Sequence, residues 1–128
     1  MSTWVIPCNT KYYDHKGAFE KLTEVDWRQS ANMEAGDIVY IYVGRPISSL
    51  LYKCEIIKTN MDDTDGSDNE FILGESLKKA KRYMRVRLLE KYPEGKFDRV
   101  SLLENGLKTI QGPSKVESDF IGYIEGHK

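Results

Sequence analysis

The stretch GDIVYIYVG, residues 36–44, decides the predicted fold class of this chain. Its six central residues, Ile38 to Val43, are all β-branched or aromatic, a composition that favours a β-strand. Alternation along that strand puts Tyr40 and Tyr42 on one side and three aliphatic residues on the other. We therefore expect a strand whose aliphatic side faces the hydrophobic core and whose opposite side is aromatic.

Further strands are predicted on both sides of this stretch. Residues 4–7 form a short β-prone run that ends at Pro7, and LLYKCEIIKT at 50–59 follows a turn and is expected to be an antiparallel partner. In RYMRVRLL at 82–89, basic and apolar residues alternate, which predicts a strand with one basic face. The segment DWRQSANMEAGD at 26–37 has no sustained period, so we expect a loop or a brief helical turn there.

Three short helices complete the predicted elements. Asp14 is placed to cap the first, over residues 15–22, and Gly106 occupies a C′ position after the second, SLLENGL at 101–107. Ser118 is placed to cap the last helix, and IQGP at 110–113 must be extended or turning. Together these elements predict one α+β domain over residues 1–128, with a strongly bent and mostly antiparallel sheet.

Composition and charge set broad limits on function. The 128 residues are 40% hydrophobic and 30% charged, which is typical of one folded domain. A net charge of −1 argues against a protein that binds nucleic acid through its overall charge. The charges are segregated, however, because five of the nine residues at 62–70 are acidic and six of the ten at 78–87 are basic. We expect the second segment to form a positive face.

The sequence offers few groups for catalysis. His15 and His127 are the only histidines and Cys8 and Cys54 the only cysteines, and no metal-binding spacing or phosphate-binding loop occurs. Cys8 and His15 could form a nucleophile and its base, but a half-buried free thiol near a surface imidazole is the simpler interpretation. We expect a protein without catalytic residues, metal or cofactor. It has neither a leader pattern nor an apolar run of about 20 residues, so we expect a cytoplasmic location and no membrane.

The aromatic residues suggest a pocket instead. Trp27 lies in the polar setting DWRQS, where hydrogen-bond donors and acceptors flank the indole ring. A planar ring that stacks on tryptophan and meets amide groups at its edge is how proteins hold an extruded base. Trp27 is therefore the first candidate for a binding residue.

Several segments, in matching order, resemble the EVE domain of the PUA-like superfamily. They are TWVIPCN at 3–9, DWRQS at 26–30, GDIVYIYVG at 36–44, LYKCEI at 51–56 and IQGP at 110–113, followed by the final helix. More narrowly, the chain is similar to the EVE-type modules found alone or fused to HNH nucleases in bacterial restriction systems that depend on DNA modification. The resemblance implies a PUA-like pseudo-barrel that reads a flipped, modified base.

The resemblance also nominates site residues. The base pocket would lie between the end of the first strand, the loop before the Gly-Asp strand and the barrel wall, and would comprise Trp4, Cys8, Asn9, Trp27, Gln29, Ser30, Tyr40 and Tyr42, with Gln111 and Gly112 as secondary candidates. Trp27 and one tyrosine would sandwich the base, while amide and hydroxyl groups pair with its edge. The phosphate contacts would come from Lys78, Lys79, Lys81, Arg82, Arg85 and Arg87.

The ligand and the partner stay open at this stage. The resemblance favours DNA that carries methylated or hydroxymethylated cytosine or methylated adenine, but modified RNA is an alternative, because PUA-like pockets serve both. A small-molecule sensor for a free nucleoside or another planar metabolite is a second alternative, favoured if the basic strand is buried or is neutralised by the acidic segment. An effector nuclease, as a fused domain or a separate protein, is the further partner that the resemblance suggests.

Overall fold

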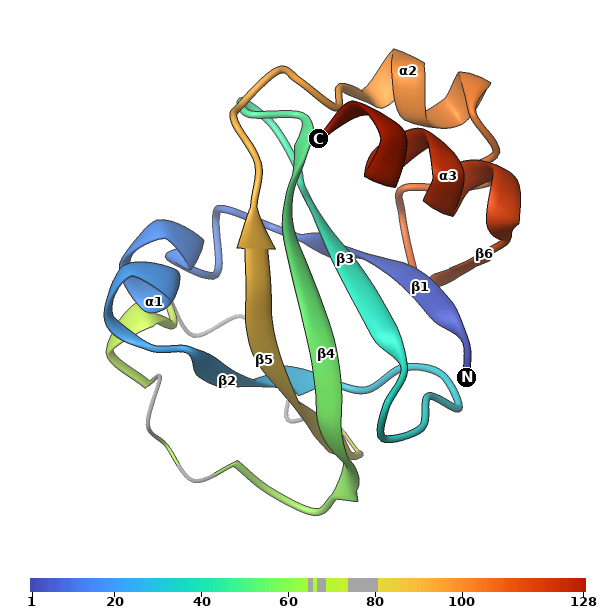
Figure 1. Cartoon of the computed structure of the whole chain (residues 1–128). Helices are drawn as coiled ribbons and strands as arrows, with labels where there is room; N and C mark the ends of the chain where they lie inside the picture. Colours follow the sequence, from blue (N-terminus) through green and yellow to red (C-terminus); the bar gives the residue numbers. More distant parts are fainter. Residues whose placement is uncertain (65, 67–68, 74–80) are drawn as a thin grey trace.

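The computed structural model describes residues 1–64, 66, 69–73 and 81–128, and in them six strands form one curled, half-barrel sheet (Figure 1). The order of the strands in the sheet is β2-β5-β4-β3-β1-β6. The strands are β1 (Thr3–Cys8), β2 (Glu24–Arg28), β3 (Ile38–Val43), β4 (Ser49–Met61), β5 (Tyr83–Lys91) and β6 (Ser114–Val116). The helices are α1 (His15–Lys21), α2 (Arg99–Glu104) and α3 (Ser118–His127), with a 3-10 turn, η1, at Asn69–Phe71. The predicted α+β pseudo-barrel of the PUA-like type is confirmed.

The sheet is mixed and irregular, which allows it to curl. β1 pairs with β3 in parallel, whereas the pairs β1–β6, β3–β4, β4–β5 and β2–β5 are antiparallel. The register shifts once between β3 and β4 and three times between β4 and β5. Bulges of this kind bend the bulged strand and increase its local twist. The 13-residue β4 therefore bends with its partners instead of running flat.

Both faces of β3 are buried, so the prediction of a single aliphatic core face was incomplete. Val39 and Ile41 belong to a cluster inside the curl, which α1 closes with Ala18 and Phe19. Tyr40, which is 1% exposed, belongs to a second cluster on the other face, beneath α2 and α3. Figure 1 shows these two helices together, away from α1. The aromatic side of the strand is thus mostly core.

The helix predictions hold except for one cap. The Asp14 side chain caps α1 by accepting a hydrogen bond from the backbone N–H of Gly17, and Gly106 follows α2 with a φ of +107°. Ser118 was expected to cap the last helix, but it is the first residue of α3, and the preceding Glu117 makes no side-chain cap. None of the helices in the described residues has the length and apolar character that a membrane span requires.

β2 corrects the start of the predicted loop at 26–37, whereas residues 29–37 contain neither helix nor strand, as predicted. Residues Glu24 to Arg28 pair with residues 83–87 at the start of β5, with Trp27 opposite Met84. Three of the five residues are charged, which hid the strand from a hydrophobic pattern. One of these charges, Asp26, is paired with Arg85 across the two strands, so β5 supplies both the backbone hydrogen bonds and the counter-charge that make this segment a strand.

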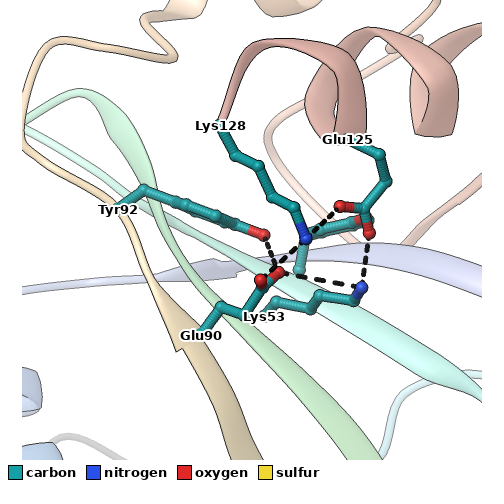
Figure 2. A network of polar contacts seen from close by, with 6 residues as sticks. Lys53, Glu90, Tyr92, Glu125 and Lys128 are labelled. Atoms are coloured by element: carbon teal, nitrogen blue, oxygen red, sulfur yellow. Dashed lines mark hydrogen bonds and ion pairs between the residues drawn. The ribbon is translucent and has the colours of Figure 1, made fainter.

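An ion cluster fixes the end of α3 to the sheet (Figure 2). We call it the α3 ion cluster, and its members are Lys53 on β4, Glu90 on β5, and Glu125 and Lys128 at the end of α3. Lys53 binds Glu125, and Lys128 Nζ lies 2.7 Å from Glu90 and 2.8 Å from Glu125. The hydroxyl of Tyr92 donates to Glu90 at 3.0 Å. Two lysines and two glutamates balance here, so these four side chains carry no net charge.

Candidate nucleic-acid interface

The curl of the sheet brings its two ends together around a cleft beside Trp27. Ile6 and Pro7 come from the end of β1, while β2 forms the opposite edge of the sheet. The cleft has a volume of about 600 Å³, and its described lining is Ile6, Pro7, Trp27, Arg28, Gln29, Ser30, Lys81, Arg82, Gln111, Gly112 and Pro113. We call it the Trp27 cleft. It lies where the half-barrel fails to close.

Trp27 is held in this cleft by its neighbour Tyr13. The two rings meet edge to face, with their centroids 5.2 Å apart and an angle of 64° between the planes. Such a contact fixes the orientation of an aromatic side chain. The indole is half-buried at the edge of the interior cluster, so it is both held in place and accessible from the cleft.

Gln29 has a different role from the one predicted for it. Its side-chain oxygen accepts a hydrogen bond from the backbone N–H of Asn60 at 2.8 Å, and its amide nitrogen donates to the carbonyl of Ala31 at 3.0 Å. The residue is 5% exposed. Because both ends of the amide are engaged, Gln29 ties the end of β2 to β4 and positions the cleft rather than pairing with a base.

Arg82 brings a positive charge to the same cleft. Its guanidinium donates to the side chain of Asn60 at 2.9 Å, and to the carbonyl of Ala31 and the side chain of Asn32, both at 3.0 Å. All three acceptors are neutral, and within the described chain no carboxylate pairs with Arg82. The three bonds hold the guanidinium in place without neutralising it.

A second cleft adjoins the first at Pro7 and Gln111. It has a volume of about 470 Å³, and its described lining is Pro7, Cys8, Asn9, Tyr42, Gly44, Arg45, Ser48, Arg99, Ile110 and Gln111. We call it the Arg45 cleft. Across both clefts, the described lining includes five basic residues and no acidic one. The two clefts together form a positively charged groove.

The predicted pocket residues are distributed over this groove, with two exceptions. Trp27, Ser30 and the secondary candidate Gly112 line the Trp27 cleft, Cys8, Asn9 and Tyr42 line the Arg45 cleft, and Gln111 lines both. Trp4 and Tyr40 lie outside the described linings. The Trp4 indole donates to the carboxylate of Asp37 at 3.1 Å, and Tyr40 is buried beneath α3, where its hydroxyl donates to Glu125 at 3.4 Å. Both serve the fold.

Two of the predicted phosphate contacts on the basic strand, Arg85 and Arg87, are engaged in ion pairs. Arg85 binds both carboxylate oxygens of Asp26, at 2.8 and 3.3 Å, and Arg87 pairs with Glu55. The described partners lie on neighbouring strands, Asp26 on β2 and Glu55 on β4. Lys81 and Arg82 line the Trp27 cleft, while Lys78 and Lys79 lie outside the described residues.

Sequence reasoning missed three basic residues of the groove. Arg28 follows Trp27 in the chain, whereas Arg45 and Arg99 are isolated arginines, one after β3 and one at the start of α2. No local spacing links them, because the fold alone brings them together. The one available signal was that Arg28 stands within the DWRQS segment already chosen for Trp27.

The two cysteines and His15 lie in the interior of the protein. Burial raises the pKa of both Cys8 and Cys54 to about 12, so both remain protonated thiols near neutral pH. His15 is buried, not exposed as predicted, and its Nδ1 shares a hydrogen bond with the hydroxyl of Tyr52. Burial lowers the pKa of His15. Among the residues that the structure describes, no three metal-binding side chains gather at one place.

Comparison with known proteins identifies the fold. No family model and no curated protein matches the sequence. A mutant of the ASCH protein from Zymomonas mobilis superposes with a TM-score of 0.68 at 10% identity, covering 98% of each chain. A hypothetical protein from Leishmania major gives 0.66 at 15% identity, over 98% of this chain and 93% of that one. A protein from Agrobacterium tumefaciens gives 0.59 at 13% identity, over 97% and 90%. The chain therefore shares the half-barrel fold of ASCH domains, which belong to the PUA-like superfamily.

Proposed function

We propose that this chain is a non-catalytic nucleic-acid-binding module that holds one flipped, modified base of DNA in the Trp27 cleft. The observation that carries the proposal is the combination found there: an accessible tryptophan in a cleft whose described lining is basic and free of carboxylates. A base needs a flat partner, and its phosphates need cations. An EVE-like role fits the same geometry, and the fold that the chain shares with ASCH domains is compatible with it.

Stacking on Trp27 would supply most of the base affinity. Base-aromatic stacking contributes about 1–3 kcal/mol per base. Ile6, Pro7 and Pro113 add apolar surface to the same cleft, against which a methyl substituent can pack. Burying one methyl group contributes about 0.8 kcal/mol, which corresponds to roughly a fourfold preference for the methylated base. We therefore expect modest selectivity for modification.

Of the polar side chains predicted to meet the base edge, Ser30 and the secondary candidate Gln111 fit the structure best. Gln29 is engaged internally, and the side-chain oxygen of Asn9 accepts a hydrogen bond from the backbone N–H of Lys11 at 3.0 Å. Ser30 and Gln111 line the Trp27 cleft, and within the described chain nothing occupies their side-chain polar groups. They are our candidates for reading the edge, since an unpaired buried polar atom costs about 1–3 kcal/mol.

The interior chemistry supports a binding role over a catalytic one. A nucleophilic cysteine must ionise, and burial holds the pKa of Cys8 at about 12. The only imidazole near it in sequence, His15, is committed to Tyr52. Neither residue contributes a reactive group to the Trp27 cleft.

The test is fluorescence-anisotropy binding at low salt to matched DNA and RNA oligonucleotides, unmodified or carrying 5-methylcytosine, 5-hydroxymethylcytosine or N6-methyladenine. We expect tighter binding to one modified DNA, a loss of about tenfold in Trp27→Ala, and partial recovery in Trp27→Phe. Trp4→Phe, outside both clefts, is the control and should bind like the wild type. A preference for RNA would change the proposed ligand from DNA to RNA. Equal binding by Trp27→Ala and the wild type would refute the base pocket.

A small-molecule sensor is the second candidate, and the neutralised strand favours it. With Arg85 and Arg87 paired, the basic strand itself offers less free positive charge for a polyanion. A free modified nucleoside would then suffice as the ligand. Calorimetry with 5-methyldeoxycytidine alone separates the candidates, because a sensor should bind it as tightly as the oligonucleotide that contains it.

A further inference from the structure

We propose that the Arg45 cleft binds the backbone phosphate next to the flipped base, so that the ligand of the groove is a continuous strand. This inference rests on the proposed function, since it needs a base at Trp27. It assigns a ligand class to a cleft that the resemblance treats only as part of a base pocket. It also distinguishes a strand-binding module from a nucleoside sensor.

The two clefts share their walls. The end of β1 gives Ile6 and Pro7 to the Trp27 cleft and Pro7, Cys8 and Asn9 to the Arg45 cleft. Ile110 and Gln111 line the Arg45 cleft, and Gln111, Gly112 and Pro113 line the Trp27 cleft, so Gln111 is common to the two. At about 3.3 Å per residue, the wall from Ile6 to Asn9 is about 10 Å long. That length exceeds the roughly 3.4 Å between successive nucleotides along one strand of a duplex, so the groove is long enough for more than one nucleotide.

The Arg45 cleft has the charge that a phosphate requires. Arg45 and Arg99 are both exposed, and within the described chain no hydrogen bond or ion pair engages either guanidinium. Asp98, the neighbour of Arg99, lies outside the described lining, and its carboxylate caps α2 through the backbone N–H of Ser101 at 2.9 Å. Two unpaired guanidiniums offer forked donors that match the oxygens of a phosphate.

Neutral donors complete this cleft. Among the described residues, only the side-chain oxygen of Asn9 is engaged, so its amide nitrogen can donate to a ligand. The hydroxyl of Ser48 lines the same space. The lining is more polar than that of the Trp27 cleft, where Ile6, Trp27 and Pro113 provide apolar surface. A base therefore fits the first cleft and a phosphate the second.

The experiment compares two double variants that remove equal charge. Arg45→Gln/Arg99→Gln removes the cations of the cleft, and Lys108→Gln/Lys115→Gln removes two exposed cations outside the described linings. The probe is a single-stranded DNA of about 12 nucleotides with one 5-methylcytosine, or the modified base preferred in the screen above. We expect about a tenfold loss for the cleft variant and a salt dependence weaker by about 0.7 in log–log slope, the value for one phosphate contact on a single strand. The control should lose much less.

A neutral methylphosphonate then locates the contact. Placed beside the modified base, it should weaken wild-type binding, yet have little effect in Arg45→Gln/Arg99→Gln, which has already lost that contact. Placed four nucleotides away, it should affect both proteins equally. Equal losses in the two double variants, or additive effects of variant and methylphosphonate, would overturn the assignment.

The failures of the two proposals are distinguishable. If Trp27→Ala binds the oligonucleotide like the wild type, or if the wild type does not bind it, the proposed function fails and this inference with it. If Trp27→Ala weakens binding but the cleft variant matches its control, only the phosphate site is refuted. A nucleoside that binds as tightly as the strand refutes both proposals, because that is the result expected of a small-molecule sensor.

Discussion

Replacing Lys53 by methionine should destabilise the protein through the α3 ion cluster. Lys53 Nζ binds Glu125 and lies 3.8 Å from Glu90, and its side chain is only 18% exposed. Lys53→Met keeps the length and apolar stem of the side chain but removes one of the two lysines of the cluster. Glu125 and Glu90 then repel each other with only Lys128 to balance them.

The magnitude follows from the partial burial of these groups. Breaking a fully buried ion pair costs about 3–5 kcal/mol, whereas exposed pairs contribute about 0.2–1 kcal/mol. With side chains 18% and 30% exposed, the Lys53–Glu125 pair lies between these limits, so we expect a loss of about 2 kcal/mol. For a domain of this size that corresponds to a decrease in Tm of about 8 °C.

The assay is urea unfolding at pH 7, with Lys58→Met as the matched control. Lys58 lies on the same strand, is exposed and makes no ion pair in the described residues, so its replacement should change the free energy of unfolding by less than about 0.5 kcal/mol. The double variant Lys53→Met/Glu125→Leu should recover part of the loss, since apolar residues can replace a buried pair. A loss in Lys53→Met no larger than in Lys58→Met would refute the stabilising role of the cluster.

Three further predictions concern stability. Gly17→Ala should cost about 1–2 kcal/mol in thermal unfolding, because an added Cβ would clash with the Asp14 carboxylate that caps α1 and would lie 2.9 Å from the Phe71 ring. Burial lowers the pKa of His15 below its ordinary 6.5, so the unfolded chain takes up a proton first and stability should fall as the pH drops below about 6.5; His15→Phe should flatten that part of the curve. Burial alone would raise the pKa of Asp37, but hydrogen bonds from Ser2, Glu34 and Trp4 hold it below its ordinary 3.8. Asp37→Asn should therefore cost about 2 kcal/mol near pH 7 and less as the pH falls below 3.8, as unfolding at both pH values would show.

Each of these predictions has an outcome that contradicts it. The control for Gly17→Ala is Gly122→Ala in α3, where space is open around the added Cβ and alanine should be tolerated or slightly stabilising. Equal unfolding free energies for Gly17→Ala and the wild type would contradict the clash with Asp14. An unchanged pH profile in His15→Phe would mean that another group titrates there, and a loss in Asp37→Asn that is the same at both pH values would contradict the role of the ionised carboxylate.

Most of the fold could be predicted because its strongest signals are local. The alternation in β3, the returning strand β4 and the Asp14 cap each depend on neighbouring residues, and each prediction is confirmed. β2 and β6 could not be predicted in this way. β2 is stabilised by β5, whose Arg85 supplies the counter-charge to the buried Asp26, and β6 has only three residues, too few for a period to show.

The site was harder to predict than the fold. Trp27 stood out because its polar sequence setting is unusual for a core residue, and the structure places it in a cleft. Tyr40 was predicted to line the pocket only because the alternation of β3 places it on the aromatic face. That face is buried, because α2 and α3 pack against it. Arg85 and Arg87 looked like a basic surface because their partners, Asp26 and Glu55, are distant in sequence. Arg45 and Arg99 could not be found without the tertiary contacts that bring them together.

The pairing of β1 has a consequence for the order in which the protein can assemble. This first strand bonds to β3 at residues 38–43 on one side and to β6 at residues 114–116 on the other. More than a hundred further residues must be synthesised before β6, its second neighbour, is available for pairing. Such long-range pairing slows folding. Ile6 and Pro7 of the same strand line the groove, together with residues 110–113. The groove therefore forms late, and a nascent chain should acquire binding only after β6 has emerged from the ribosome.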